Sequence, residues 1–208
     1  MVFKKNQDII KMKYLTSIAL ILVTLFSYGQ NFKTLEVFRN NDTIPSGKAI
    51  FYGSFIQRLG FTSGGFPQDI RLINTDTKEV FTFRVKPAYK STKENNFFYV
   101  IKPGNYAILH YWWTQSKWYG SKFFTEPIFK GIDSKDDLIA KLKSGKIKES
   151  DLIRYSFTIT ENSLNYLGTW HFDSGLVSFT NDKKDMDNKV MEKYRNINLS
   201  TATINLPN

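Results

Sequence analysis

Residues 96–113 read NFFYVI, then KPGN, then YAILHYWW, and this stretch decides the fold class. Two runs of aromatic and β-branched residues, which favour strands, flank four turn-forming residues. Pro103 and Gly104 stand where a type II turn takes proline and glycine. The stretch therefore predicts a β-hairpin.

Strand-like runs separated by turn signals continue on both sides of this stretch. The apolar or alternating runs are 48–56, 69–74, 79–85, 153–159, 166–172 and 176–180, and the tail near 203–204 could add an edge strand. Residues 75–78 are polar and lie between two alternating runs, so they predict another hairpin.

Two segments have helical spacing. Leu138, Ile139 and Leu142 form an apolar stripe that stops at Gly145, and residues 134–137 can cap it. Within 182–194, Met186, Val190 and Tyr194 recur at intervals of four residues. We therefore expect a mainly β fold: an antiparallel sandwich of immunoglobulin or prealbumin type with one inserted helix and one C-terminal helix.

The N-terminus has the pattern of a secretory signal peptide. A lysine-rich start is followed by twelve uncharged residues, Leu15–Phe26, and by the small-residue exit Ser27-Tyr28-Gly29. The apolar run is shorter than the about 20 residues that cross a bilayer as a helix. We expect residues 1–29 to be cleaved, leaving one domain, 30–208, without a transmembrane span, in the periplasm, the cell envelope or the extracellular space.

Composition restricts the possible partners. The chain has no cysteine and a net charge of +10. The signal segment carries four of the lysines and one aspartate, so about +7 belongs to residues 30–208. The lysines are scattered, and no arginine-rich block indicates nucleic-acid binding. We expect a cell-envelope protein or polysaccharide as the partner, and no nucleic acid.

Two short pieces resemble known modules. Lys102-Pro103-Gly104-Asn105-Tyr106 is similar to the Pro-Gly-x-Tyr turn of carboxypeptidase-regulatory-like domains, which are sandwiches of prealbumin type. Asn165-Tyr166-Leu167-Gly168 is similar to a Tyr-Leu-Gly strand of uncharacterised exported bacterial sandwich proteins. The resemblance implies a small envelope module and carries over no functional residues.

Catalytic motifs are sparse. The only histidines are His110, expected on the same strand face as Ile108, and His171, expected on one face with Asp173. No G-x-S-x-G elbow, phosphate-binding glycine loop or compact metal-ligand spacing is present. We therefore assign no catalytic residue, no metal site and no cofactor. A hydrolase that uses His171 and Asp173, or a carboxylate pair, is the alternative.

Aromatic residues concentrate between 111 and 124, interleaved with lysines. Exposed aromatic rings are rigid contact surfaces for sugars and proteins, although aromatic residues also dominate cores. Trp113, Trp118 and Tyr119 are the candidate contact residues. We expect an exported, non-catalytic cell-envelope protein with a binding or scaffolding role.

Overall fold

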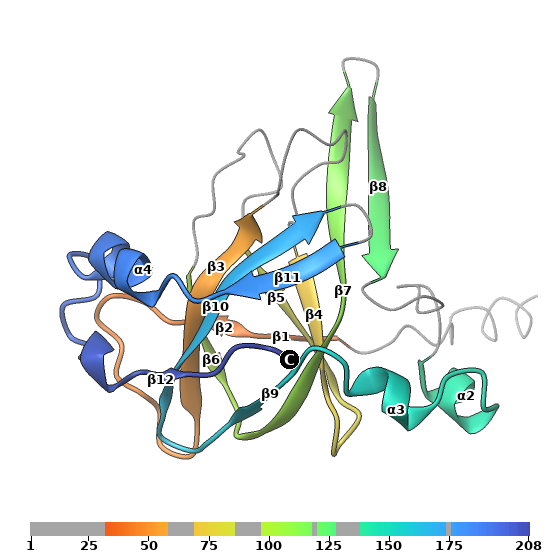
Figure 1. The fold of residues 1–208 in the computed structure, drawn as a ribbon, viewed down its shortest axis with the longest axis horizontal. Coiled ribbons are helices and arrows are strands. Elements are labelled where there is room, and N and C mark those ends of the chain that lie inside the picture. The colour runs from red at the N-terminus through yellow and green to blue at the C-terminus, as the bar shows by residue number, and fades with distance from the viewer. Residues whose placement is uncertain (1–31, 58–68, 86–96, 118–119, 128–137, 174–175) are drawn as a thin grey trace, which may run out of the picture. The chain divides into compact units, whose positions relative to one another are not determined.

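The computed structural model describes residues 32–57, 69–85, 97–117, 120–127, 138–173 and 176–208 (Figure 1). Side chains are described over these ranges except at 56–57, 111–127, 138–139, 172–173 and 176. The chain divides after Gln30 into two units, and every described residue belongs to the second. The fold is mainly β, with two mixed sheets and a few helices.

The first sheet has the order β1-β5-β4-β7-β8, and β9 also pairs with β7. Its strands are β1 (Lys33–Thr34), β4 (Asp69–Asn74), β5 (Val80–Arg84), β7 (Gly104–Lys117), β8 (Gly120–Pro127) and β9 (Ser156–Ile159). The second sheet has the order β11-β10-β3-β6-β2, and β12 also pairs with β10. Its strands are β2 (Glu36–Val37), β3 (Ala49–Gln57), β6 (Phe98–Ile101), β10 (Leu164–Asp173), β11 (Leu176–Thr180) and β12 (Thr203–Ile204).

The hairpin expected at residues 69–85 is confirmed by the antiparallel pairing of β4 with β5. The Asn74 side chain accepts hydrogen bonds from the backbone N–H groups of Asp76 and Thr77, which shapes the turn. At the open end, the Arg84 guanidinium donates two hydrogen bonds to Asp69, at 3.0 and 2.9 Å. Hydrogen bonds between residues near in sequence therefore stabilise both ends of this pair of strands.

The hairpin expected at residues 96–113 is wrong. Its strands exist, but β6 belongs to the second sheet and β7 to the first, so the KPGN turn crosses between sheets. Strand β6 is buried on both faces: Tyr99 and Ile101 face the core between the sheets, and Phe98 and Val100 face away from it. A strand that is buried on both faces has no alternation of apolar and polar residues. Its sequence therefore does not indicate which sheet it joins.

The expectation of purely antiparallel sheets is also corrected. β3 pairs in parallel with β10, and β1 with β5, while β12 runs parallel to β10. Parallel neighbours need a long connection, and β3 and β10 are separated by residues 58–163, about half of the chain. Local sequence patterns therefore do not predict these parallel pairings.

The main core lies between the two sheets. Aromatic side chains dominate it, including Phe51, Phe55, Phe83, Tyr99 and Trp170, and the indole N–H of Trp170 donates to the Leu167 carbonyl. Phe55 and Trp170 meet edge to face with ring centroids 4.9 Å apart. Each such ring contributes about 1.5–3 kcal/mol by burial alone, which explains how a cysteine-free chain holds two sheets together.

Helical segments cover the outer face of each sheet (Figure 1). The helix α4 (Lys183–Val190) and the 3₁₀ turn η1 (Leu199–Thr201) lie on the second sheet, and Met186, Val190 and Tyr194 are buried there as their spacing predicts. The helices α2 (Leu138–Lys143) and α3 (Glu149–Leu152) lie on the first sheet. The sequence pattern does not predict α3, and β9 starts three residues later than the predicted run.

Candidate functional site

A pocket of about 300 Å³ opens where the start of α4 passes over the ends of β3 and β10. Of the described residues that line it, six are polar or charged, namely Ser54, Thr169, His171, Asp182, Asp185 and Lys189, and one, Met186, is apolar. The strand residues come from β3 and β10, which are distant in sequence and adjacent in the sheet. Asp185, Met186 and Lys189 come from one face of α4, because they are spaced three or four apart, and Asp182 is the N-cap residue just before that helix.

A bulge in β10 brings the strand residues to the pocket. The register between β3 and β10 shifts between Tyr166 and Thr169, and it places Thr169 directly opposite Ser54. Gly168 lies in the shifted segment with a φ of +93°, which a residue with a Cβ rarely adopts. The bulge therefore sets which side chains of β10 face α4.

Asp182 is the centre of the hydrogen-bond network. Its carboxylate accepts from the Thr180 hydroxyl at 2.6 Å, and its backbone N–H donates to the Tyr166 hydroxyl at 3.1 Å. The hydrogen bond from Thr180, then that from Thr169, and the nearby His171 lower the pKa of Asp182. Asp182 occupies the N-cap position of α4, but its side chain accepts no hydrogen bond from the helix backbone. Its carboxylate accepts a hydrogen bond from Thr180 of β11 instead.

The network determines the tautomer of His171. The Thr180 hydroxyl gives its only proton to the carboxylate of Asp182, so it must accept from Nε2 of His171, 2.8 Å away. Nε2 therefore carries a proton. Nδ1 of His171 is buried and has no hydrogen-bond partner among the described residues. His171 is thus held as a donor through Nε2.

Lys189 brings the positive charge to the lining. Its ammonium lies 4.3 Å from the centre of the Phe97 ring, a cation–π distance that holds the lysine at the pocket wall. Asp185 is exposed one turn earlier on the same helix face. Hydroxyls, carboxylates and an ammonium therefore border one small volume beside His171, an arrangement that can donate to and accept from a polar ligand.

Comparisons with protein-family models, curated proteins and solved structures find no match for this chain. Two further findings concern the described residues. No three His, Asp or Glu side chains among them come together as a metal site would require. No helix in that part of the chain has the length and apolar character needed to cross a membrane.

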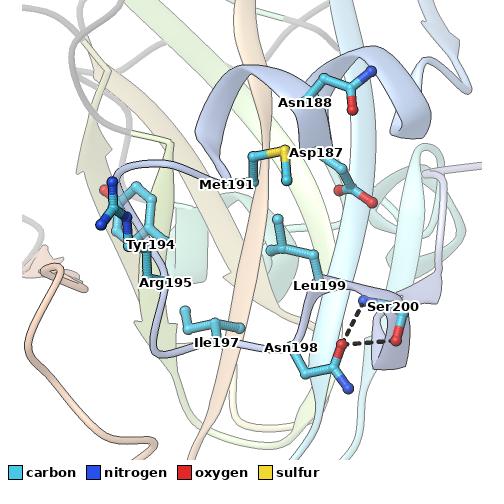
Figure 2. A pocket seen from close by; sticks show the side chains of 9 residues that line it. All are labelled: Asp187, Asn188, Met191, Tyr194, Arg195, Ile197, Asn198, Leu199 and Ser200. Carbon is cyan, nitrogen blue, oxygen red and sulfur yellow. Dashed lines mark hydrogen bonds between the residues drawn. The ribbon is translucent and has the colours of Figure 1, made fainter.

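A second hollow, of about 420 Å³, lies on the other side of α4 (Figure 2). Met191, Ile197 and Leu199 point toward its centre, and Met191 is 54% exposed. Its polar atoms are largely committed: Asn198 accepts from the backbone N–H and hydroxyl of Ser200, and Asp187 accepts from Tyr52 and Lys183. The charged residues described in its lining are Asp187 and Arg195, and Asp187 is already paired with Lys183.

The predicted aromatic contact residues are only partly placed. The backbone of Trp113 lies in β7, opposite Phe124 of β8. Trp118 and Tyr119 lie outside the described residues. The aromatic surface therefore stays a prediction.

The two histidines do not share a site. His110 is 1% exposed in the first sheet, where its Nε2 accepts from Nη1 of Arg71 at 2.8 Å. Burial lowers the pKa of Arg71, whose guanidinium lies 3.6 Å from the Phe32 ring centre. The expectation that His110 shares a face with Ile108 is wrong, because a register shift intervenes and His110 pairs with the outward-facing Arg71.

Of the sequence candidates whose side chains the structure describes, His171 lines the pocket. The Asp173 side chain lies outside the described residues, and Asp182 is the carboxylate that the network connects to His171. Sequence reasoning missed Asp182, Asp185 and Lys189 as a group, although their spacing within the predicted helix at 182–194 places them on one face. No sequence signal indicates that Ser54 joins them.

Proposed function

We propose that the protein is an exported, non-catalytic binding protein of the cell envelope that holds a hydroxyl-rich ligand, such as an envelope polysaccharide, in the pocket beside α4. The ligand class follows from the lining. Sugar hydroxyls donate and accept, so they match carboxylates, hydroxyls and an ammonium placed around one volume. The single observation that carries this proposal is the group of six polar or charged side chains that surround the pocket.

Export is supported by the signal-peptide pattern of residues 1–29. We further propose that the two packed sheets form a sandwich of immunoglobulin or prealbumin type. The shared aromatic core and the resemblance of residues 102–106 to carboxypeptidase-regulatory-like domains support that fold type. In this proposal, the periplasm or the cell surface supplies the polysaccharide.

The pocket is suited to binding because its central groups are fixed before a ligand arrives. Asp182 is held ionised by two threonine hydroxyls, and His171 is held as a donor by Thr180. Fixed polar groups lose little conformational entropy when a ligand binds. Asp185 and Lys189 remain as the exposed charged groups that a ligand can contact directly.

Isothermal titration calorimetry with purified envelope polysaccharide fragments tests the proposal. We expect Asp185→Asn and Lys189→Gln each to weaken binding about tenfold, since one charge-assisted hydrogen bond contributes about 1.5 kcal/mol. Lys184→Gln is the matched control, because Lys184 is exposed on α4 and does not line the pocket. Failure of every fragment to bind, or equal weakening by the control, would contradict the proposal.

A hydrolase is the second candidate, because His171, Asp182 and Asp185 line the same pocket. The low pKa of Asp182 suits a permanently charged group better than a general acid, which needs a raised pKa. This alternative predicts that the protein releases reducing ends from the bound polysaccharide, and that Asp185→Asn abolishes the release while binding is retained. Both results together would establish a hydrolase and exclude a purely binding role.

A further inference from the structure

The β7–β8 ladder extends beyond the rest of its sheet (Figure 1). The last pair between β4 and β7 is Asp69 with Trp112, whereas β7 and β8 stay paired as far as Lys117 with Gly120. Strand β8 ends the strand order, so in the described residues its outer edge has no partner strand. An eight-residue edge is a template on which another strand can pair.

We propose that β8 pairs with β8 of a second copy of this chain, antiparallel and about a two-fold axis, joining the first sheets of two molecules. A two-fold axis makes the contact self-complementary, because the same strand is used on both sides. The antiparallel geometry limits the register: opposite residues must both belong to hydrogen-bonded pairs or both to non-hydrogen-bonded pairs. Because the hydrogen-bonding direction alternates from one residue to the next, two opposite residues must both have odd numbers or both have even numbers.

Two registers that satisfy this condition place the two-fold axis near the middle of β8. In the first register, Phe124 lies opposite Phe124 of the second copy, and Lys122 of each copy lies opposite Glu126 of the other copy. In the second register, Phe123 lies opposite Phe123 of the second copy. Lys122 of each copy then lies opposite Phe124 of the other, and Glu126 lies opposite Gly120. Opposite charges directly across an antiparallel pair are stabilising, so charge complementarity selects the register centred on Phe124.

The same residues explain why a second copy is a better occupant than an unrelated strand. A lysine in the middle of an edge strand normally discourages pairing. Glu126 of the second copy neutralises that lysine, and the aromatic pair at Phe124 adds to the stability of the contact. Pro127 has no N–H and ends the ladder at each side of the contact.

Sedimentation equilibrium of the purified protein tests the proposal. We expect a dimer whose dissociation constant rises about tenfold or more in Lys122→Glu and in Glu126→Lys, because each change sets two like-charged pairs opposite each other. Mixing the two single variants should restore dimers, since one copy then presents carboxylates at both positions and the other presents ammonium groups at both. The double variant K122E/E126K should also dimerise.

Cysteine cross-linking tests the register in a chain that has no cysteine of its own. Phe124→Cys should form a disulfide-linked dimer under mild oxidation, because directly opposite Cα atoms lie about 4.5–5.5 Å apart. Phe123→Cys is the control and should cross-link poorly. A monomeric wild-type protein, single variants that dimerise unchanged, or stronger cross-linking at position 123 would overturn the proposal. Circular dichroism melts check that each variant is folded.

Discussion

The side chain of Leu206 occupies the place that a Cβ on Gly168 would need. A Cβ built on Gly168 would lie 2.6 Å from Cδ2 of Leu206 and 2.9 Å from the Thr180 carbonyl oxygen. The bulge that shapes the pocket is therefore locked by the C-terminal tail, which packs against it.

We predict that Gly168→Ala lowers the free energy of unfolding by about 3 kcal/mol, since a positive φ and a steric clash act together. Chemical denaturation measures this loss. The double variant G168A/L206A should lose less than the sum of the two single variants, because Leu206→Ala removes part of the clash. Additive losses would show that the two residues do not interact.

The C-terminal tail connects the two sheets and should contribute strongly to stability. Asn205 donates its backbone N–H to the Tyr166 carbonyl in the second sheet, and Asn208 exchanges two backbone hydrogen bonds with Ser156 in the first. We predict that deleting residues 203–208 costs about 3 kcal/mol or more, through Leu206 and the lost hydrogen bonds. Deleting Asn208 alone should cost about 2 kcal/mol, because two hydrogen bonds are lost. Thermal melts of both truncations check this prediction. Equal losses of stability in the two truncations would contradict it.

Asp182 should make stability depend on pH in the acid range. Its pKa is lowered in the folded state, chiefly by the hydrogen bond from Thr180, so its contribution is present above the unfolded pKa of about 4. The contribution is lost as the pH falls through the folded pKa. Because Asp182 is exposed, we expect less than about 1 kcal/mol.

Denaturation curves between pH 7 and pH 2 test this dependence in the wild type and in Thr180→Val. The valine cannot donate to Asp182, so the acid-dependent loss should shrink in the variant. Asp185→Asn is the control, because it removes a neighbouring carboxylate that lies outside this network. An unchanged pH dependence in Thr180→Val would contradict the role assigned to the network.

Much of the fold can be read from the sequence where one face of a strand is buried. The β4–β5 hairpin is an example, because Phe81 and Phe83 alternate with Thr82 and Arg84. Residues 96–113 show the limit: Phe98–Ile101 are all buried, so the choice between two sheets depends on distant strands. The candidate site shows the same limit, since Ser54 and Thr169 meet only through the parallel pairing of β3 with β10.

The helix predicted at 182–194 forms on the expected residues but ends earlier, at Val190. Tyr194 still packs under it, because the following turns return its ring to within 4.1 Å of Phe98, measured between centroids. The apolar spacing thus predicts the buried face, and the polar spacing of Asp182, Asp185 and Lys189 on the same segment places three residues at the pocket. His171 joins that group through Thr180, which no local pattern indicates.

Binding of a hydroxyl-rich ligand in the pocket beside α4 can be measured by mapping amide chemical-shift changes in the folded protein during titration with an envelope polysaccharide fragment. We expect saturable changes centred on Ser54, Thr169, His171, Asp185 and Lys189, which Lys189→Gln weakens and Lys184→Gln does not. Changes centred instead on Trp113, Trp118 and Tyr119, with the pocket amides unmoved, would contradict it and assign binding to the aromatic surface.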